Sequence, residues 1–203
     1  MSESTTIQYE RGDDGIVILT IDDPNQGANT MNRAYAESMA ATVERLEAEK
    51  DDIKGVIITS GKKTFFAGGD LNDLLAVTKE QAPEFAEGLR EIKGQLRRLE
   101  TLGVPVVAAV AGSALGGGLE ITLATHHRVV VDDPKIQLGT PEVSLGLLPG
   151  GGGVTRTVRM MGIANALLNV LIQGKPLRPA KALELGLISE LVDSPDDLIP
   201  AAK

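Results

Sequence analysis

Two glutamates stand in glycine-rich segments of the sequence where almost no other charge occurs. Glu120 ends the run PVVAAVAGSALGGGLE (105–120), and no other charged residue lies between Pro105 and His126. Glu142 is the only charge in GTPEVSLGLLPGGGG (139–153). Two carboxyl groups can serve as general acid and general base when the fold brings them to one reacting atom. Each glutamate alone also fits an ordinary first-turn helix charge, so neither position decides the chemistry by itself.

Two glycine turns stand next to expected helix starts. Gly116, Gly117 and Gly118 follow the uncharged strand 106–110, and Gly68 and Gly69 lie in FFAGGD (65–70). Glycine lets the backbone turn sharply and lets a ligand approach it closely. The first N–H groups of a helix lack an intrahelical partner and carry the positive end of the helix dipole. Both turns therefore offer N–H donors to a negative or partly negative oxygen.

Several residues near these turns also have plain structural explanations. Asp70 is a candidate N-cap for a short helix over 71–77, and the phenylalanines at 65 and 66 either wall a pocket or fill the core. Ser113 lies in a glycine turn that does not match the G-x-S-x-G elbow of hydrolases. The chain also contains a set of basic residues, Lys62, Lys63, Lys93, Arg97 and Arg98. Such a set is most simply a solvated face, although Lys62 and Lys63 flank a glycine turn and suit a phosphorylated ligand.

Composition excludes several classes of function. The 203-residue chain has a net charge of −8 and a pI near 4.8, whereas a nucleic-acid partner needs a basic face. It has no cysteine and only two histidines, which are adjacent, so we expect no disulfide and no metal site. The uncharged run 101–119 contains a proline and five glycines, which excludes a membrane span. With no signal peptide at the N-terminus, we expect a cytoplasmic protein.

Strand and helix patterns alternate along the chain, which predicts one α/β domain with mostly parallel strands over residues 1–203. The strands are expected at 6–10, 15–21, 55–59, 106–110, 127–131 and 188–192. The helices are expected at 32–50, with Asn32 as N-cap, at 71–77, at 83–102, after Gly116, at 154–171 with a break at Gly162, at 179–185 and at 196–202.

The three glycine-rich motifs FFAGGD, PVVAAVAGSALGGGLE and QLGTPEVSLGLLPGGGG (137–153), in this order, resemble the crotonase superfamily. The resemblance runs from about Thr6 to the C-terminus. The phrases LLPGGGG and GANTMN are similar to the N-terminal hydratase part of multifunctional fatty-acid β-oxidation proteins of the α-subunit type. This resemblance implies the ββα spiral of that superfamily, without the C-terminal helical segment that closes the acyl pocket and builds a trimer in relatives. The domain is then C-terminally incomplete.

The resemblance also assigns roles by position. Gly69 and Gly117 match the two amides of an oxyanion hole. Glu120 and Glu142 match the acid–base carboxylates of hydratases. The segment that lies along coenzyme A (CoA) in relatives matches Ala67 and its neighbours, so the residues expected to contact the substrate are Ala67, Gly68, Asp70 and Gly116.

The implied function is hydration of trans-2-enoyl-CoA to 3-hydroxyacyl-CoA in fatty-acid β-oxidation. Acyl-CoA is then the substrate, and no metal or cofactor is needed. The alternatives are a Δ3-Δ2 enoyl-CoA isomerase, a serine peptidase of related fold that uses Ser113, and a non-catalytic fragment. We expect a trimer-type homo-oligomer or a part of a larger multifunctional protein, because apolar faces around Leu167, Leu171 and Leu187 are expected to need a cover.

Overall fold

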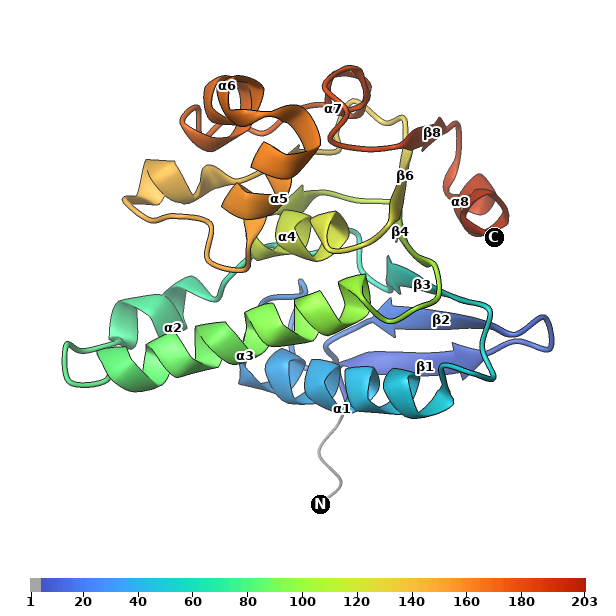
Figure 1. Cartoon of the computed structure of the whole chain (residues 1–203). Coiled ribbons are helices and arrows are strands. Elements are labelled where there is room, and N and C mark those ends of the chain that lie inside the picture. The colour runs from blue at the N-terminus through green and yellow to red at the C-terminus, as the bar shows by residue number, and fades with distance from the viewer. Residues whose placement is uncertain (1–4) are drawn as a thin grey trace.

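A six-stranded mixed sheet forms the centre of the computed structural model, which describes residues 5–203 (Figure 1). The strand order is β1-β2-β3-β4-β6-β8; β1 runs antiparallel to β2, and every other neighbouring pair is parallel. The strands are β1 (Ile7–Arg11), β2 (Ile16–Ile21), β3 (Gly55–Ser60), β4 (Val106–Val110), β6 (His127–Val131) and β8 (Glu190–Val192). The expected α/β architecture is therefore confirmed.

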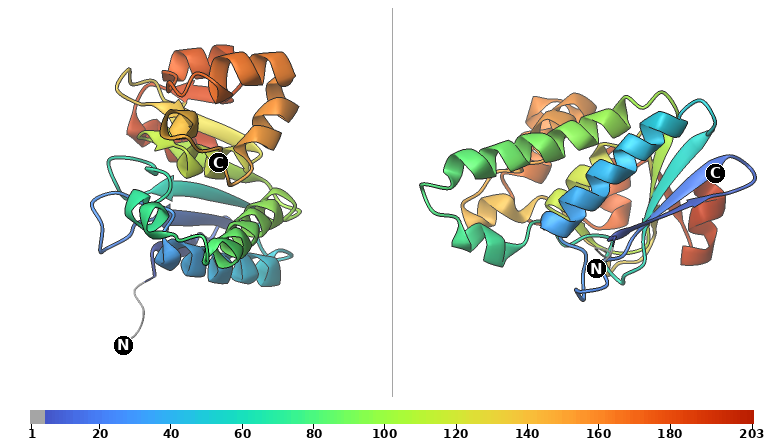
Figure 2. Two further views of the ribbon diagram at one scale, coloured as in Figure 1. Left: turned by 90° about the vertical axis from the view of Figure 1, so that its left-hand side faces the viewer. Right: turned by 90° about the horizontal axis from the view of Figure 1, so that it is seen from below.

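Two long helices, α1 (Arg33–Glu49) and α3 (Ala82–Glu100), lie side by side along one side of the sheet (Figure 2). Asn32 caps α1 as expected, because its side chain accepts a 2.8 Å hydrogen bond from Tyr35 N. The two helices are joined by Arg98, whose guanidinium pairs with both carboxylate oxygens of Glu47 at 2.8 and 2.6 Å. The short helix α2 (Leu71–Ala76) precedes α3.

A second group of elements, which contains α4 (Gly117–Leu123) and α5 (Gly153–Met161), lies above α3 in Figure 1. The remaining helical elements are the 3₁₀ segment η1 (Pro141–Leu145), α6 (Ile163–Ala166), the π-helical segment η2 (Leu167–Leu171), α7 (Pro179–Glu184) and α8 (Pro195–Ala202). The expected break at Gly162 is confirmed, since Gly162 has φ of 77° and separates α5 from α6. α8 packs against the strands on the side away from α1 (Figure 2).

The small parallel sheet formed by β5 (Ala114–Leu115) and β7 (Leu138–Gly139) was not expected. Each strand has two residues, too few for the period-two pattern by which strands are recognised in a sequence. This sheet nevertheless has a clear role: Leu115 and Gly139 lie opposite each other, so the segments that carry the two glutamates are paired directly before each of them.

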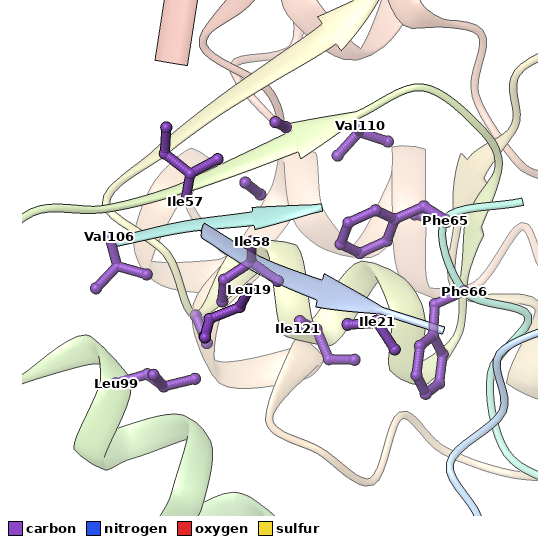
Figure 3. Packing of buried hydrophobic residues seen from close by; sticks show 14 of the residues in the cluster. Leu19, Ile21, Ile57, Ile58, Phe65, Phe66, Leu99, Val106, Val110 and Ile121 are labelled. Carbon is purple, nitrogen blue, oxygen red and sulfur yellow. The ribbon is translucent and has the colours of Figure 1, made fainter. Parts of the chain in front are cut away.

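The core is aliphatic and contains both phenylalanines of the first glycine motif. Phe65 and Phe66 are fully buried among Leu19, Ile21 and Val110 (Figure 3), so they fill the core and do not wall a pocket. One of the apolar faces expected to be uncovered is also buried, because Leu187 has no exposed area. Leu167, by contrast, is 42% exposed, and its neighbours Ile163 and Leu168 are exposed as well.

Candidate active site

The two glycine turns are in direct contact. Gly68 and Gly116 have φ values of 97° and 53°, which residues with a side chain rarely adopt. A Cβ on Gly68 would lie 3.1 Å from Leu115 O, and a Cβ on Gly116 would lie 3.7 Å from Gly68 Cα. Two backbone hydrogen bonds hold the segments together, from Phe66 N to Ser113 O at 3.2 Å and from Leu115 N to Phe66 O at 3.1 Å.

The amides of Gly69 and Gly117 lie at this contact. A Cβ on Gly117 would lie 3.9 Å from the carbonyl carbon of Gly68, the atom to which Gly69 N is bonded. The N–H of Gly116 is occupied, since it donates to Gly139 O at 2.8 Å. Gly117 is the first residue of α4, and within residues 5–203 neither its N–H nor that of Gly69 donates a hydrogen bond. Both donors are therefore available to a ligand.

Glu120 is buried beneath the glycine loop that leads into α5. The residue is 2% exposed, and its Oε1 accepts a 2.7 Å hydrogen bond from Gly153 N. A Cβ on Gly151 would lie 2.8 Å from Glu120 Oε2, and a Cβ on Gly153 would lie 3.0 Å from Oε1. The loop must be glycine at these positions because any side chain would collide with the carboxylate.

Glu142 approaches the same place from η1. Its Oε1 would lie 2.7 Å from a Cβ on Gly116, and its Oε2 is buried without a hydrogen-bond partner among the described residues. Burial raises the pKa of Glu142 from 4.5 to about 7, a hydrogen bond with its own backbone opposes this, and the negative charge of Glu120 raises the pKa further. The structure thus brings together the two glutamates that stood out in the sequence and gives them unequal surroundings.

The residues expected along the substrate lie at the rim of this site. Ala67 is exposed and donates its N–H to Asn29 O at 2.8 Å, while Gly68 is buried. Asp70 caps α2 as expected, because its Oδ1 accepts from Asp73 N at 3.4 Å. Asn29 lies in the phrase GANTMN, but no local pattern gives this residue a role of its own. It is 1% exposed and holds the loops of this rim together through its side-chain amide.

Met31 belongs to the same phrase, GANTMN, and likewise has no role of its own that a local pattern indicates. Its N–H donates to Gly68 O at 2.8 Å, and its Cε would lie 2.9 Å from a Cβ on Gly117. Met31 and Gly69 also border a cavity of about 510 Å³ between α1, α2 and α3. Most of its wall is apolar and comes from Ala36, Ala40, Leu74, Val77, Phe85, Leu89 and Ile92.

Ser113 has other partners than a catalytic triad requires. Its hydroxyl accepts a 3.0 Å hydrogen bond from Gln137 N. His126 Nδ1 accepts from Val106 N at 2.9 Å, and His127 lies 3.4 Å from Glu190 on the surface. Between Thr5 and Lys203, no histidine is hydrogen-bonded to Ser113. Ser113 therefore lacks the base that a serine nucleophile needs.

Comparison with known proteins identifies the family. The Enoyl-CoA hydratase/isomerase family matches residues 11–202. The chain belongs to this family. Among curated relatives of this chain, the fatty acid oxidation complex subunit alpha of Shewanella frigidimarina is 43% identical to it over 194 residues, and that of Idiomarina loihiensis is 42% identical over 193 residues. Each match covers 95% of this chain and 27% of the relative, so the chain spans about a quarter of their length.

Solved structures confirm the fold of the family. The enoyl-CoA hydratase of Bacillus anthracis superposes with a TM-score of 0.86 at 28% identity, covering 97% of this chain and 73% of that chain. The enoyl-CoA hydratase of Thermoplasma volcanium gives a TM-score of 0.84 at 28% identity, covering 98% of this chain and 76% of that chain. The crotonase-like fold and the resemblance to the hydratase part of a fatty-acid oxidation α-subunit are therefore confirmed.

Proposed function

We propose that this domain hydrates trans-2-enoyl-CoA to 3-hydroxyacyl-CoA, as the hydratase part of a fatty-acid β-oxidation protein. The observation that carries the proposal is the meeting of Glu120 and Glu142 beside two touching glycine turns with free N–H groups. Family membership and the names of the relatives agree with this reaction. Because one fold can support several activities, the fold alone does not fix the reaction, and the residues of the site carry the proposal.

The amides of Gly69 and Gly117 would bind the thioester oxygen of the substrate. Water adds to C3 of the enoyl group, and the electrons of the double bond move onto this oxygen as an enolate. Two fixed N–H donors stabilise the new negative charge, and removal of one such donor typically costs about 10²–10³ in rate. The dipole at the start of α4 acts in the same direction.

The unequal surroundings of the glutamates support different roles. The Glu120 carboxylate accepts a hydrogen bond from Gly153 N, which fixes its position. We assign Glu120 as the base that removes a proton from water as its oxygen bonds to C3. Glu142, whose pKa is about 7, is the acid that protonates C2 and regenerates the thioester carbonyl. Exchange of one proton with solvent then restores the starting state of the pair.

The substrate would lie with its CoA portion along Ala67, Gly68, Asp70 and Gly116, and its acyl chain would enter the apolar cavity beyond Met31. The two carboxyl groups and the two amides account for every proton and charge in the reaction, so we propose that it uses no cofactor or metal.

The chain would assemble as a homo-oligomer or within a multifunctional protein, and the exposed residues Ile163, Leu167 and Leu168 support such a contact. A cytoplasmic location remains a prediction. Within residues 5–203, no helix has both the length and the apolar composition needed to cross a bilayer.

A Δ3-Δ2 enoyl-CoA isomerase is the second candidate, because this reaction needs only one carboxyl group to move a proton between carbon atoms, and the raised pKa of Glu142 suits that role. The serine peptidase alternative is not supported by the surroundings of Ser113. The non-catalytic alternative differs from both enzymes in predicting no turnover of any enoyl-CoA.

The test is hydration of crotonyl-CoA, followed by loss of the conjugated thioester absorbance, in Glu120→Gln, Glu142→Gln and the double variant. Each single substitution should cost about 10²–10⁴ in rate, and the double should lose much less than the product of the singles. Glu120→Gln should retain more isomerase than hydratase activity. Intact hydration in Glu120→Gln would refute the hydratase mechanism and favour the isomerase. Hydration by the unchanged protein should also decline as the pH rises through about 7, because Glu142 then loses the proton that C2 must receive.

A further inference from the structure

A second cavity, of about 330 Å³, lies between α3 and α5. Figure 1 shows the helix α5 above α3. Four basic side chains and one acidic side chain line it. The lining residues are Lys93, Arg97 and Glu100 from α3, Gly151 and Gly152 from the glycine loop, and Thr155, Arg156 and Arg159 from α5. Nothing in the proposed hydration reaction uses this cavity, although its floor is the same loop that covers Glu120.

The positive charges of the cavity are only partly compensated. Glu100 pairs with Arg156 at 3.0 Å and with Arg97 at 2.9 Å, and so serves two arginines at once. Lys93 and Arg159 are exposed and form no ion pair with the part of the chain that the structure describes. Two cations are thus left without a partner, and the lining, with four basic side chains and one acidic, has a net charge of +3 in a chain whose net charge is −8. Like charges gathered around a hollow repel each other, and a bound anion relieves that repulsion.

The basic residues that the sequence grouped together are separated by the fold. Lys62 pairs with Asp22 at 2.8 Å, and Arg98 pairs with Glu47 at 2.6 Å. Lys93 and Arg97, in contrast, border the cavity. Arg156 and Arg159 reach the same hollow from α5, more than fifty residues later in the chain. The charge at this place is therefore a product of the tertiary structure and not of one solvated helix face.

We propose that this cavity is a second ligand site, and that it binds a phosphate group carried by a small molecule. Arginine and lysine bind phosphate through charge-assisted hydrogen bonds, which guanidinium groups make in pairs. A phosphate dianion compensates more of the net charge of +3 than a single carboxylate would, and the Thr155 hydroxyl adds a neutral donor. Arg156 is held in place by Gly151 O at 3.0 Å and by Glu100, so one wall of the site is already ordered. The proposal does not depend on the hydratase reaction.

The test is isothermal titration calorimetry of the whole chain with two probes, inorganic diphosphate and adenosine 3′,5′-bisphosphate, at low salt. The double variant K93A/R159A removes the two unpaired cations without touching the Glu100 pairs. K50A/K135A removes two exposed lysines outside the cavity and is the matched control. We expect the K93A/R159A variant to bind at least about tenfold more weakly than the unchanged protein, and the control to bind within about twofold of it.

The two probes distinguish the sources of the phosphate. Diphosphate binding that K93A/R159A loses shows a site for the phosphate group itself. Loss confined to the nucleotide shows a site that requires the phosphate ester, and either result supports the proposal. Absence of binding by both probes, or equal affinity in the two double variants, would overturn it. Crotonyl-CoA hydration in the same preparations is a separate readout, so failure of the proposed reaction and failure of this site can be told apart.

Discussion

The substitution Glu142→Gln should stabilise the folded protein at alkaline pH relative to acidic pH. The folded-state pKa of Glu142 is about 7, against 4.5 for the free group. As the pH rises through this window, the unfolded chain releases its proton first, and the free energy of unfolding falls. Above about pH 7 the folded state is ionised as well and the loss reaches its full value. A glutamine at this position does not ionise, so the free energy of unfolding of the variant does not fall for this reason as the pH rises.

The size of the effect follows from the same two pKa values. Full conversion of a rise from 4.5 to about 7 corresponds to ~3 kcal/mol, at ~1.4 kcal/mol for each pKa unit. Because Glu142 is only partly buried, solvent screening reduces this to ~1–2 kcal/mol. The new amide has the same packing and hydrogen-bonding consequences at every pH. The difference between the two pH values therefore isolates the ionisation of Glu142.

Urea unfolding followed by far-ultraviolet circular dichroism, at about pH 4 and about pH 8, measures this difference, because the two values lie on either side of the window from 4.5 to about 7. Glu10→Gln is the control, because it makes the same chemical change at a glutamate that is exposed on β1, outside the site. The reasoning would be refuted if Glu142→Gln changed stability by the same amount at both pH values, or if it were relatively more stable at the acidic one. Such a result would mean that the carboxyl of Glu142 ionises freely in the folded protein.

Three further predictions concern the glycine turns and the loop that supports them. Gly117→Pro removes an N–H donor and should lower the turnover of crotonyl-CoA far more than it weakens acyl-CoA binding, measured by calorimetry, whereas equal losses would contradict the oxyanion assignment. Gly112→Ala should destabilise the protein by about 1–3 kcal/mol or more in urea unfolding, since its Cβ would lie 2.1 Å from Lys63 O, and Gly27→Ala, with open space around it, should have little effect. Asn29→Ala should cost about 2–4 kcal/mol in the same assay, because it leaves buried backbone groups without their partner, and a smaller loss would mean that water replaces the amide.

The sequence predicted the main sheet and the long helices because their signals are local. The uncharged run 106–110 became β4, and the apolar spacing after Asn32 became α1 with Asn32 as its cap. These features depend on residue types within one segment, so they can be recognised without knowledge of the rest of the fold. That Glu120 and Glu142 act together was implied by the resemblance to the crotonase superfamily and not by either segment alone, and their roles remain a prediction.

Other features of the site depend on contacts between distant segments. β5 and β7 are defined only by their pairing, and the 510 Å³ cavity exists only where α1, α2 and α3 come together. Met31 lies against Gly117 across 86 positions of sequence, and no local pattern marks it. The apolar residue Leu187 was expected on an uncovered face but is buried, since helical spacing shows which residues share a face and not what covers that face.

The two glutamates differ because the loops around them supply different partners. Gly153 places a backbone N–H against Glu120, and the missing side chains at Gly151 and Gly153 leave room for its carboxylate. η1 gives Glu142 no such donor for its buried Oε2, and the charge of Glu120 opposes its ionisation. A hydrogen-bonded carboxylate is therefore accompanied by a carboxyl group whose pKa is raised above its ordinary value. The proposed hydration needs one proton removed and another delivered at neighbouring atoms, and in that proposal this asymmetry would supply a base and an acid from two identical residue types.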